Sequence, residues 1–126
     1  MIENRKPKIY LLDSGDGNFL ELATSLYSNN FFVVNPNKEI PKTWAGSLIF
    51  ETEKTLIKMC DYMIVNLPKE DIEISLKIYY AHTIETPCFV VNENGKFFNY
   101  IWLGCYVTKF FDDMFSCFEF LKNERK

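Results

Sequence analysis

Two short stretches, Tyr62 to Leu67 and Cys88 to Val91, are almost uninterrupted runs of apolar, strand-forming residues. A strand with one solvent-exposed face alternates apolar and polar residues. A strand of a parallel sheet is buried on both faces and shows continuous apolar runs. Parallel neighbours need a crossover, which is usually a helix. The two runs therefore predict a parallel sheet with a helix between its strands.

The rest of the chain repeats this alternation of strand and helix. The last helix is predicted to carry Met114, Phe115, Phe118 and Leu121 on its buried stripe. Further strands are predicted at Lys8 to Leu12, Phe31 to Val34 and Tyr106 to Phe110, further helices at Phe19 to Tyr27, Trp44 to Met59 and after Asp112 or Asp113, and loops at 35–37, 40–43 and 92–96. This order predicts an α/β fold, a doubly wound sheet of five mainly parallel strands in the order 2-1-3-4-5 with helices on both faces.

One segment is ambiguous. Ile72, Ile74, Leu76, Ile78 and Tyr80 alternate with other residues at period two, which is typical of a strand. A helix is preferred, because the segment joins two strands that are predicted to be parallel.

Length and charge narrow the classes of function. The 126 residues are expected to form a single domain. A net charge of −3 without a basic stripe argues against nucleic-acid binding. No apolar run reaches the roughly 18 residues of a membrane span, and the first residues lack the apolar segment of a signal peptide. We therefore expect a cytoplasmic chain that does not enter membranes.

The cysteines and the histidine do not predict a metal site. Cys60, Cys88, Cys105 and Cys117 form no CxxC pair, and each has apolar neighbours, so reduced, buried thiols are expected. His82 has no recognised metal-ligand spacing to any of them.

Several polar groups follow predicted strands, where ligands bind in such sheets. The turn Asp13 to Gly17 matches no phosphate-loop pattern and has two acidic residues, so a plain turn is favoured over a ligand loop. Asp71, between Glu70 and Glu73, is interpreted first as a helix cap and second as a ligand group. Glu51 and Glu53 are expected on an exposed helix face.

The segment Asn99 to Gly104 is aromatic and carries an amide. Either it is a hydrophobic loop on the core, or it lies at a subunit interface, where Asn99 offers its amide to a base or sugar.

Four segments together resemble the nucleoside 2-deoxyribosyltransferase family and its nucleoside-5′-monophosphate N-glycosidase relatives. The segments are Lys8 to Leu11, Phe32 to Pro36, Cys60 to Ile64 continuing through Tyr80 and Ala81, and Asn99 with Trp102 and Gly104. The resemblance implies a flavodoxin-like fold, a homo-oligomer with shared sites, and cleavage or transfer at the N-glycosidic bond of a deoxynucleoside without a metal or organic cofactor. A glutamate would attack the anomeric carbon.

The resemblance also implies roles for individual residues. Tyr10 matches the family's active-site tyrosine, and Asp71 matches the acid that assists the base. Glu53 is a stand-in for the carboxylate that contacts the sugar, and Asn99 matches the amide given to a neighbouring site. Asp13 is a further ligand group if the first turn lines the site.

The chain departs from the family at its centre, because Lys77 stands where the nucleophilic glutamate belongs. An ammonium cannot attack a developing cation. The flanking glycines of the motif are also absent, and Glu73, Ser75 and Tyr79 occupy that helix. Glu73 lies one turn before Lys77, about 5–6 Å along the helix axis.

Three functions follow as hypotheses. The first is a nucleoside- or nucleotide-binding protein without glycosyl transfer, in which Lys77 pairs with Asp71 or Glu73 or holds a phosphate. The second is an active transferase or hydrolase that uses Glu73 or Asp71 as its catalytic carboxylate. The third is a structural or interaction module whose cleft is closed by Tyr79 and Tyr80.

Overall fold

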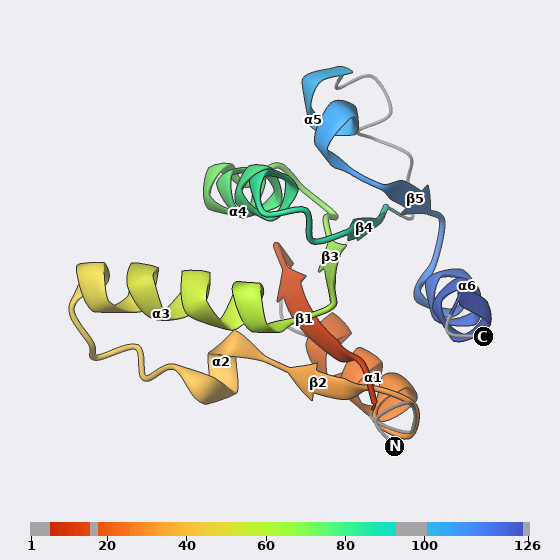
Figure 1. Ribbon diagram of the computed structural model, residues 1–126, viewed down its shortest axis with the longest axis horizontal. Helices are drawn as coiled ribbons and strands as arrows, with labels where there is room; N and C mark the ends of the chain where they lie inside the picture. Colours follow the sequence, from red (N-terminus) through yellow and green to blue (C-terminus); the bar gives the residue numbers. More distant parts are fainter. Residues whose placement is uncertain (1–5, 16–17, 93–100, 125–126) are drawn as a thin grey trace.

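The computed structural model describes residues 6–15, 18–92 and 101–124. In these residues five strands form one parallel sheet in the order β2-β1-β3-β4-β5, as predicted (Figure 1). The strands are β1 (Lys8–Asp13), β2 (Phe32–Val34), β3 (Tyr62–Asn66), β4 (Cys88–Val91) and β5 (Lys109–Phe111).

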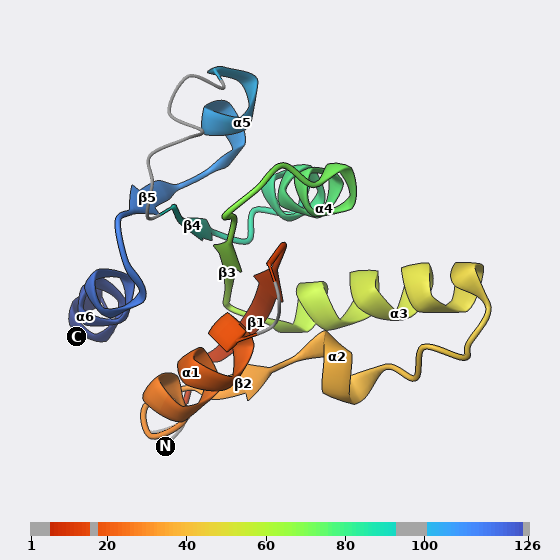
Figure 2. The ribbon, with the colours of Figure 1, turned by 180° about the vertical axis from the view of Figure 1, so that it is seen from behind.

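Helices cover both faces of the sheet, as predicted. They are α1 (Asn18–Tyr27), α2 (Pro36–Glu39), α3 (Gly46–Met59), α4 (Ile72–Thr83), α5 (Ile101–Tyr106) and α6 (Met114–Glu124). Figures 1 and 2 show α1 and α6 on one side of the sheet and α3 and α4 on the other. None of the helices in the described ranges is long and apolar enough to cross a membrane.

Alternate side chains of the strands pack into two separate hydrophobic cores, one on each face of the sheet. On β1, Ile9 and Leu11 pack in the cluster under α1 and α6, whereas Tyr10 and Leu12 pack in the cluster under α3 and α4. Because side chains of a strand alternate between faces, two covered faces require apolar residues at every position. This explains the uninterrupted runs at β3 and β4.

The ambiguous segment is the helix α4. Its buried residues are Ile74, Ile78 and Ala81, a helical spacing, while Ile72 and Leu76 are 80% and 63% exposed. Asp71 caps the helix, because its Oδ1 accepts a hydrogen bond from the backbone N–H of Ile74 at 3.0 Å. The preference for a helix and for the Asp71 cap is confirmed.

Some element boundaries were wrong. The last strand begins at Lys109 rather than Tyr106, because residues 101–106 form α5. This helix covers much of the segment expected as a loop, and it is held against α4, where Tyr106 lies 5.0 Å from both Tyr79 and His82 (ring centroids). The chain after β2 turns into the short helix α2, and α3 begins at Gly46 rather than Trp44.

The predicted buried stripe of α6 was wrong at one residue. Asp113 precedes the helix, and its Oδ1 accepts a hydrogen bond from the Ser116 N–H at 2.7 Å. Phe118 and Leu121 are buried, but Phe115 is 62% exposed. One residue turns a helix by about 100°, so Phe115 points away from the stripe that its neighbour Met114 joins.

The burial pattern of α4 predicts unequal costs for two similar truncations. Ile78→Ala removes a fully buried side chain and should lower the free energy of unfolding by about 2–5 kcal/mol. Leu76→Ala, at an exposed position, should change it by about 0.5 kcal/mol or less. Urea denaturation of both variants measures the difference. Equal costs would favour the period-two strand, in which the two residues share a face.

Candidate functional site

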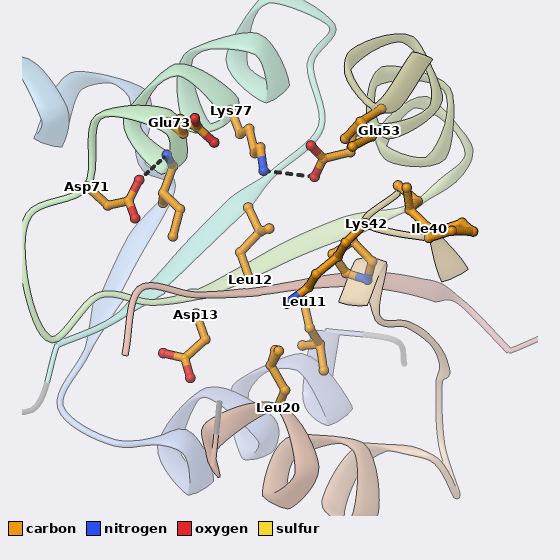
Figure 3. A pocket seen from close by; sticks show the side chains of 14 residues that line it. Leu11, Leu12, Asp13, Leu20, Ile40, Lys42, Glu53, Asp71, Glu73 and Lys77 are labelled. Carbon is orange, nitrogen blue, oxygen red and sulfur yellow. Dashed lines mark hydrogen bonds and ion pairs between the residues drawn. The ribbon is translucent and has the colours of Figure 1, made fainter. Parts of the chain in front are cut away.

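A hollow of about 240 Å³ lies at the carboxyl end of β1, between the sheet and helices α3 and α4 (Figure 3). Ligands bind at this edge of open α/β sheets. Five of the predicted site residues line it. Asp13, Glu53, Asp71, Glu73 and Lys77 line the hollow, together with Leu11, Leu12, Leu20, Pro36, Ile40, Pro41, Lys42, Ile49 and Ile74.

Lys77 extends from α4 across the hollow toward α3 (Figure 3). Its Nζ lies 2.8 Å from Oε2 of Glu53, and the two side chains are 23% and 15% exposed. The predicted pairing of Lys77 with Asp71 or Glu73 was therefore wrong. Both alternatives lie close in sequence, whereas Glu53 reaches Lys77 from a separate helix.

Tyr10, on β1, also contacts the carboxylate of Glu53. Its ring is fully buried on β1, and its hydroxyl donates a hydrogen bond to Oε2 of Glu53 at 2.9 Å. Burial, together with the negative charge of Glu53, raises the pKa of Tyr10 far above its ordinary value. The hydroxyl therefore stays protonated and keeps donating.

The expectation of an exposed Glu53 was wrong. Its oxygen accepts from Tyr10 of β1 and from Lys77 of α4 at once. Glu51, two residues earlier and on another side of the helix, is exposed as expected and pairs with Lys54 on its own helix, at 3.5 Å.

Asp71 and Glu73 lie at the N-terminus of α4. Asp71 serves as the helix cap and also lines the hollow, so both of its predicted roles remain compatible. Glu73 is an exposed residue at the same wall. The structure thus brings two carboxylates and the lysine of one helix to a single hollow.

Asp13 ends β1 and shapes the turn after it. Its Oδ1 accepts hydrogen bonds from the Gly15 N–H at 2.8 Å and from the side-chain amide of Asn66 at 2.9 Å. A Cβ on Gly15 would lie 3.1 Å from Cγ of Pro68, so the two loops approach each other closely at this residue. These contacts favour the plain-turn interpretation for the described part of the turn. Residues 16–17 lie outside it.

Two groups at this edge were missed in the sequence. Asn66 orients Asp13, and Lys42 reaches the hollow from the segment after α2 (Figure 3). Asn66 ends β3, which lies next to β1, so the predicted strand order could have indicated it, whereas Lys42 follows the helix α2, which was not predicted. Asn99 lies outside the described residues, and its role stays a prediction.

A second, apolar hollow of about 630 Å³ runs between α3 and α4. It is lined by Phe50, Leu76 and Tyr80 among others, and it shares Glu53 and Lys77 with the first hollow. The ion pair therefore stands at the junction of the two. Tyr79 and Tyr80 do not close the first hollow, because Tyr79 packs on Tyr106 and Tyr80 faces the second hollow.

The cysteines are free thiols. Burial raises the pKa of the Cys60 thiol to about 12. Cys88 and Cys117 are also buried, but Cys105 is exposed on α5, so its predicted burial was wrong. The helix α5 contains no buried residue, which explains the difference. Within residues 6–15, 18–92 and 101–124, no group of three metal-ligating side chains converges.

Neither a family model nor a curated protein matches the sequence. Solved structures do match the fold. The 2-deoxyribosyltransferase of Bacillus psychrosaccharolyticus superposes with a TM-score of 0.71 at 16% identity, over 87% of this chain and 89% of that one. A conserved protein of Enterococcus faecalis V583 gives a TM-score of 0.72 at 12% identity, over 94% and 99% of the two chains.

The CMP N-glycosidase of Clostridium botulinum is also similar, with a TM-score of 0.59 at 10% identity, over 91% of this chain and 98% of that one. Proteins that share a fold can differ in function, so function must be argued from the residues of the site. The chain has a nucleoside 2-deoxyribosyltransferase-like fold of the flavodoxin-like α/β class.

Proposed function

We propose that this chain binds a nucleoside or nucleotide in the hollow at the carboxyl edge of the sheet, and that it lacks the family's glycosyl transfer. The observation that carries the proposal is the ion pair between Lys77 and Glu53, at 2.8 Å. Lys77 stands where the resembled family has its nucleophile, and the ammonium extends into the hollow.

The chemistry of glycosyl transfer explains why this ion pair argues against turnover. The reaction passes through a positively charged, oxocarbenium-like sugar, and a carboxylate must stabilise or attack it. An ammonium repels that charge. Glu53 does not replace the missing group, because Tyr10 and Lys77 both donate to its Oε2, which stabilises the carboxylate and makes it a weaker nucleophile.

Binding is supported by the other groups of the hollow. The carboxylates of Asp13, Asp71 and Glu73 can accept hydrogen bonds from sugar hydroxyls. The side chains of Leu12 and Ile74 form part of the apolar lining of the hollow. Ligand sites combine such apolar walls with a few polar groups.

The second hypothesis, an enzyme with a rearranged nucleophile, is favoured by one observation. Glu73 lies at the wall of the hollow, one helical turn before Lys77. Because Glu73 is exposed, water would reach a sugar bound to it, so this version would act as a hydrolase. The interaction module with a closed cleft has less support, because Tyr79 and Tyr80 leave the hollow open.

Binding without turnover is the first expected outcome. Calorimetry with the four deoxynucleosides and their 5′-monophosphates should detect at least one ligand, while chromatography of the same mixtures, with and without a free acceptor base, should show no released or exchanged base. Failure of every ligand to bind would contradict the binding role. Base release that Glu73→Gln abolishes would establish the hydrolase instead.

The ion pair should contribute measurably to stability. In a double-mutant cycle with Glu53→Gln and Lys77→Met, contacting residues of this kind should show a coupling of about 0.5–3 kcal/mol in urea denaturation. The matched control is the exposed pair of Glu51 and Lys54, for which about 0.5 kcal/mol or less is expected. Equal couplings would mean that Lys77 is held no more firmly than a surface lysine.

The predicted homo-oligomer is retained as part of the proposal. Large exposed apolar side chains gather on α3, α4 and α5, including Phe50, Leu76 and Trp102, and exposed apolar patches mark interfaces. Light scattering should give a multiple of 14.9 kDa. Leu76→Glu should lower the mass, whereas Leu22→Glu, on α1 across the sheet, should not. A monomeric wild-type chain would refute this part.

A further inference from the structure

Three features at the carboxyl edge of this sheet are of kinds that proteins use to hold phosphate: a lysine, the N-terminus of a helix and the backbone N–H groups of a tight turn. They are Lys77, the start of α4 and the turn after β1. In each case a carboxylate of the chain itself already takes the position that an anionic ligand would need.

The lysine is the first case. Lys77 donates to Glu53 at 2.8 Å inside the hollow, and Glu53 is only 15% exposed. A phosphate could engage this ammonium only by displacing Glu53 or by lying beside its negative charge. The displaced carboxylate would remain largely buried, with Tyr10 as its remaining donor, and leaving a buried charge without its partner is costly.

The helix N-terminus is the second case. Ile74, in the first turn of α4, lines the hollow, and its N–H donates to Oδ1 of Asp71 at 3.0 Å. Asp71 therefore occupies the positive end of the helix dipole, where a phosphate would otherwise be favoured.

The turn after β1 is the third case. The Gly15 N–H donates to Oδ1 of Asp13 at 2.8 Å. The same oxygen accepts the amide of Asn66 at 2.9 Å, which fixes the carboxylate in place. Four carboxylates and two ammonium groups line the hollow, and the second ammonium, on Lys42, belongs to an exposed residue.

We propose that Glu53, Asp71 and Asp13 are specificity-determining residues that exclude phosphorylated ligands, so that the site takes an uncharged nucleoside. This inference rests on the proposed binding function and narrows it. The carboxylates accept hydrogen bonds from sugar hydroxyls and repel a phosphate. Like charges brought together at a binding site cost enough to decide between such ligands.

The test compares each deoxynucleoside with its own 5′-monophosphate by calorimetry. The wild-type chain should bind the monophosphate at least about tenfold more weakly. Asp71→Asn removes a charge and keeps a good helix cap, because Asn is as favourable there as Asp. Glu53→Gln removes the negative charge that pairs with Lys77, so the ammonium is available to a phosphate. Each variant should lower the ratio of the two dissociation constants by about threefold or more.

Glu51→Gln is the matched control, since it removes the same charge from the same helix outside the hollow. It should leave the ratio unchanged. The ratio compares two ligands on one variant, so a loss of folded protein does not alter it. A monophosphate that binds the wild type as tightly as its nucleoside would overturn this inference while the binding function stands. Absence of binding by both ligands would overturn the binding function and this inference together.

Discussion

The site depends on one carboxylate oxygen. Oε2 of Glu53, on α3, accepts hydrogen bonds from Tyr10 of the central strand β1 and from Lys77 of α4. Three elements of one face of the sheet thus meet at a single atom. A mostly buried carboxylate needs such partners, because an unpaired charge away from water is costly. The same contacts orient Lys77 across the hollow and place the ion pair between the polar hollow and the apolar one.

A lysine at position 77 therefore affects more than one group of the site. A glutamate there would face Glu53 at the distance of an ion pair, and two adjacent carboxylates resist simultaneous ionisation. With lysine the charges neutralise each other, which favours a stable site over a reactive one. The remaining carboxylates of the hollow are tied to local backbone, with Asp71 at the start of α4 and Asp13 in the turn after β1.

Most of the fold was predictable, because both faces of the sheet are covered. Continuous apolar runs at β3 and β4 require a parallel sheet, and a parallel sheet requires α4 to be a helix despite its period-two pattern. The errors fall where local patterns are weak. The helix α5 has no buried residue and is held by Tyr106 against α4, so its sequence shows no amphipathic stripe. The exposure of Cys105 follows from the same fact.

The sequence by itself determined the sheet, its strand order and the Asp71 cap. These depend on residue type and local spacing. Only the tertiary structure decided which carboxylate Lys77 binds. Glu53 lies 24 residues earlier, on another helix. Helical spacing from the buried Ile57 places Glu53, four residues earlier, on the inward side of α3. No local pattern indicates that Lys77 meets it there, because the contact depends on how α3 and α4 pack over β1.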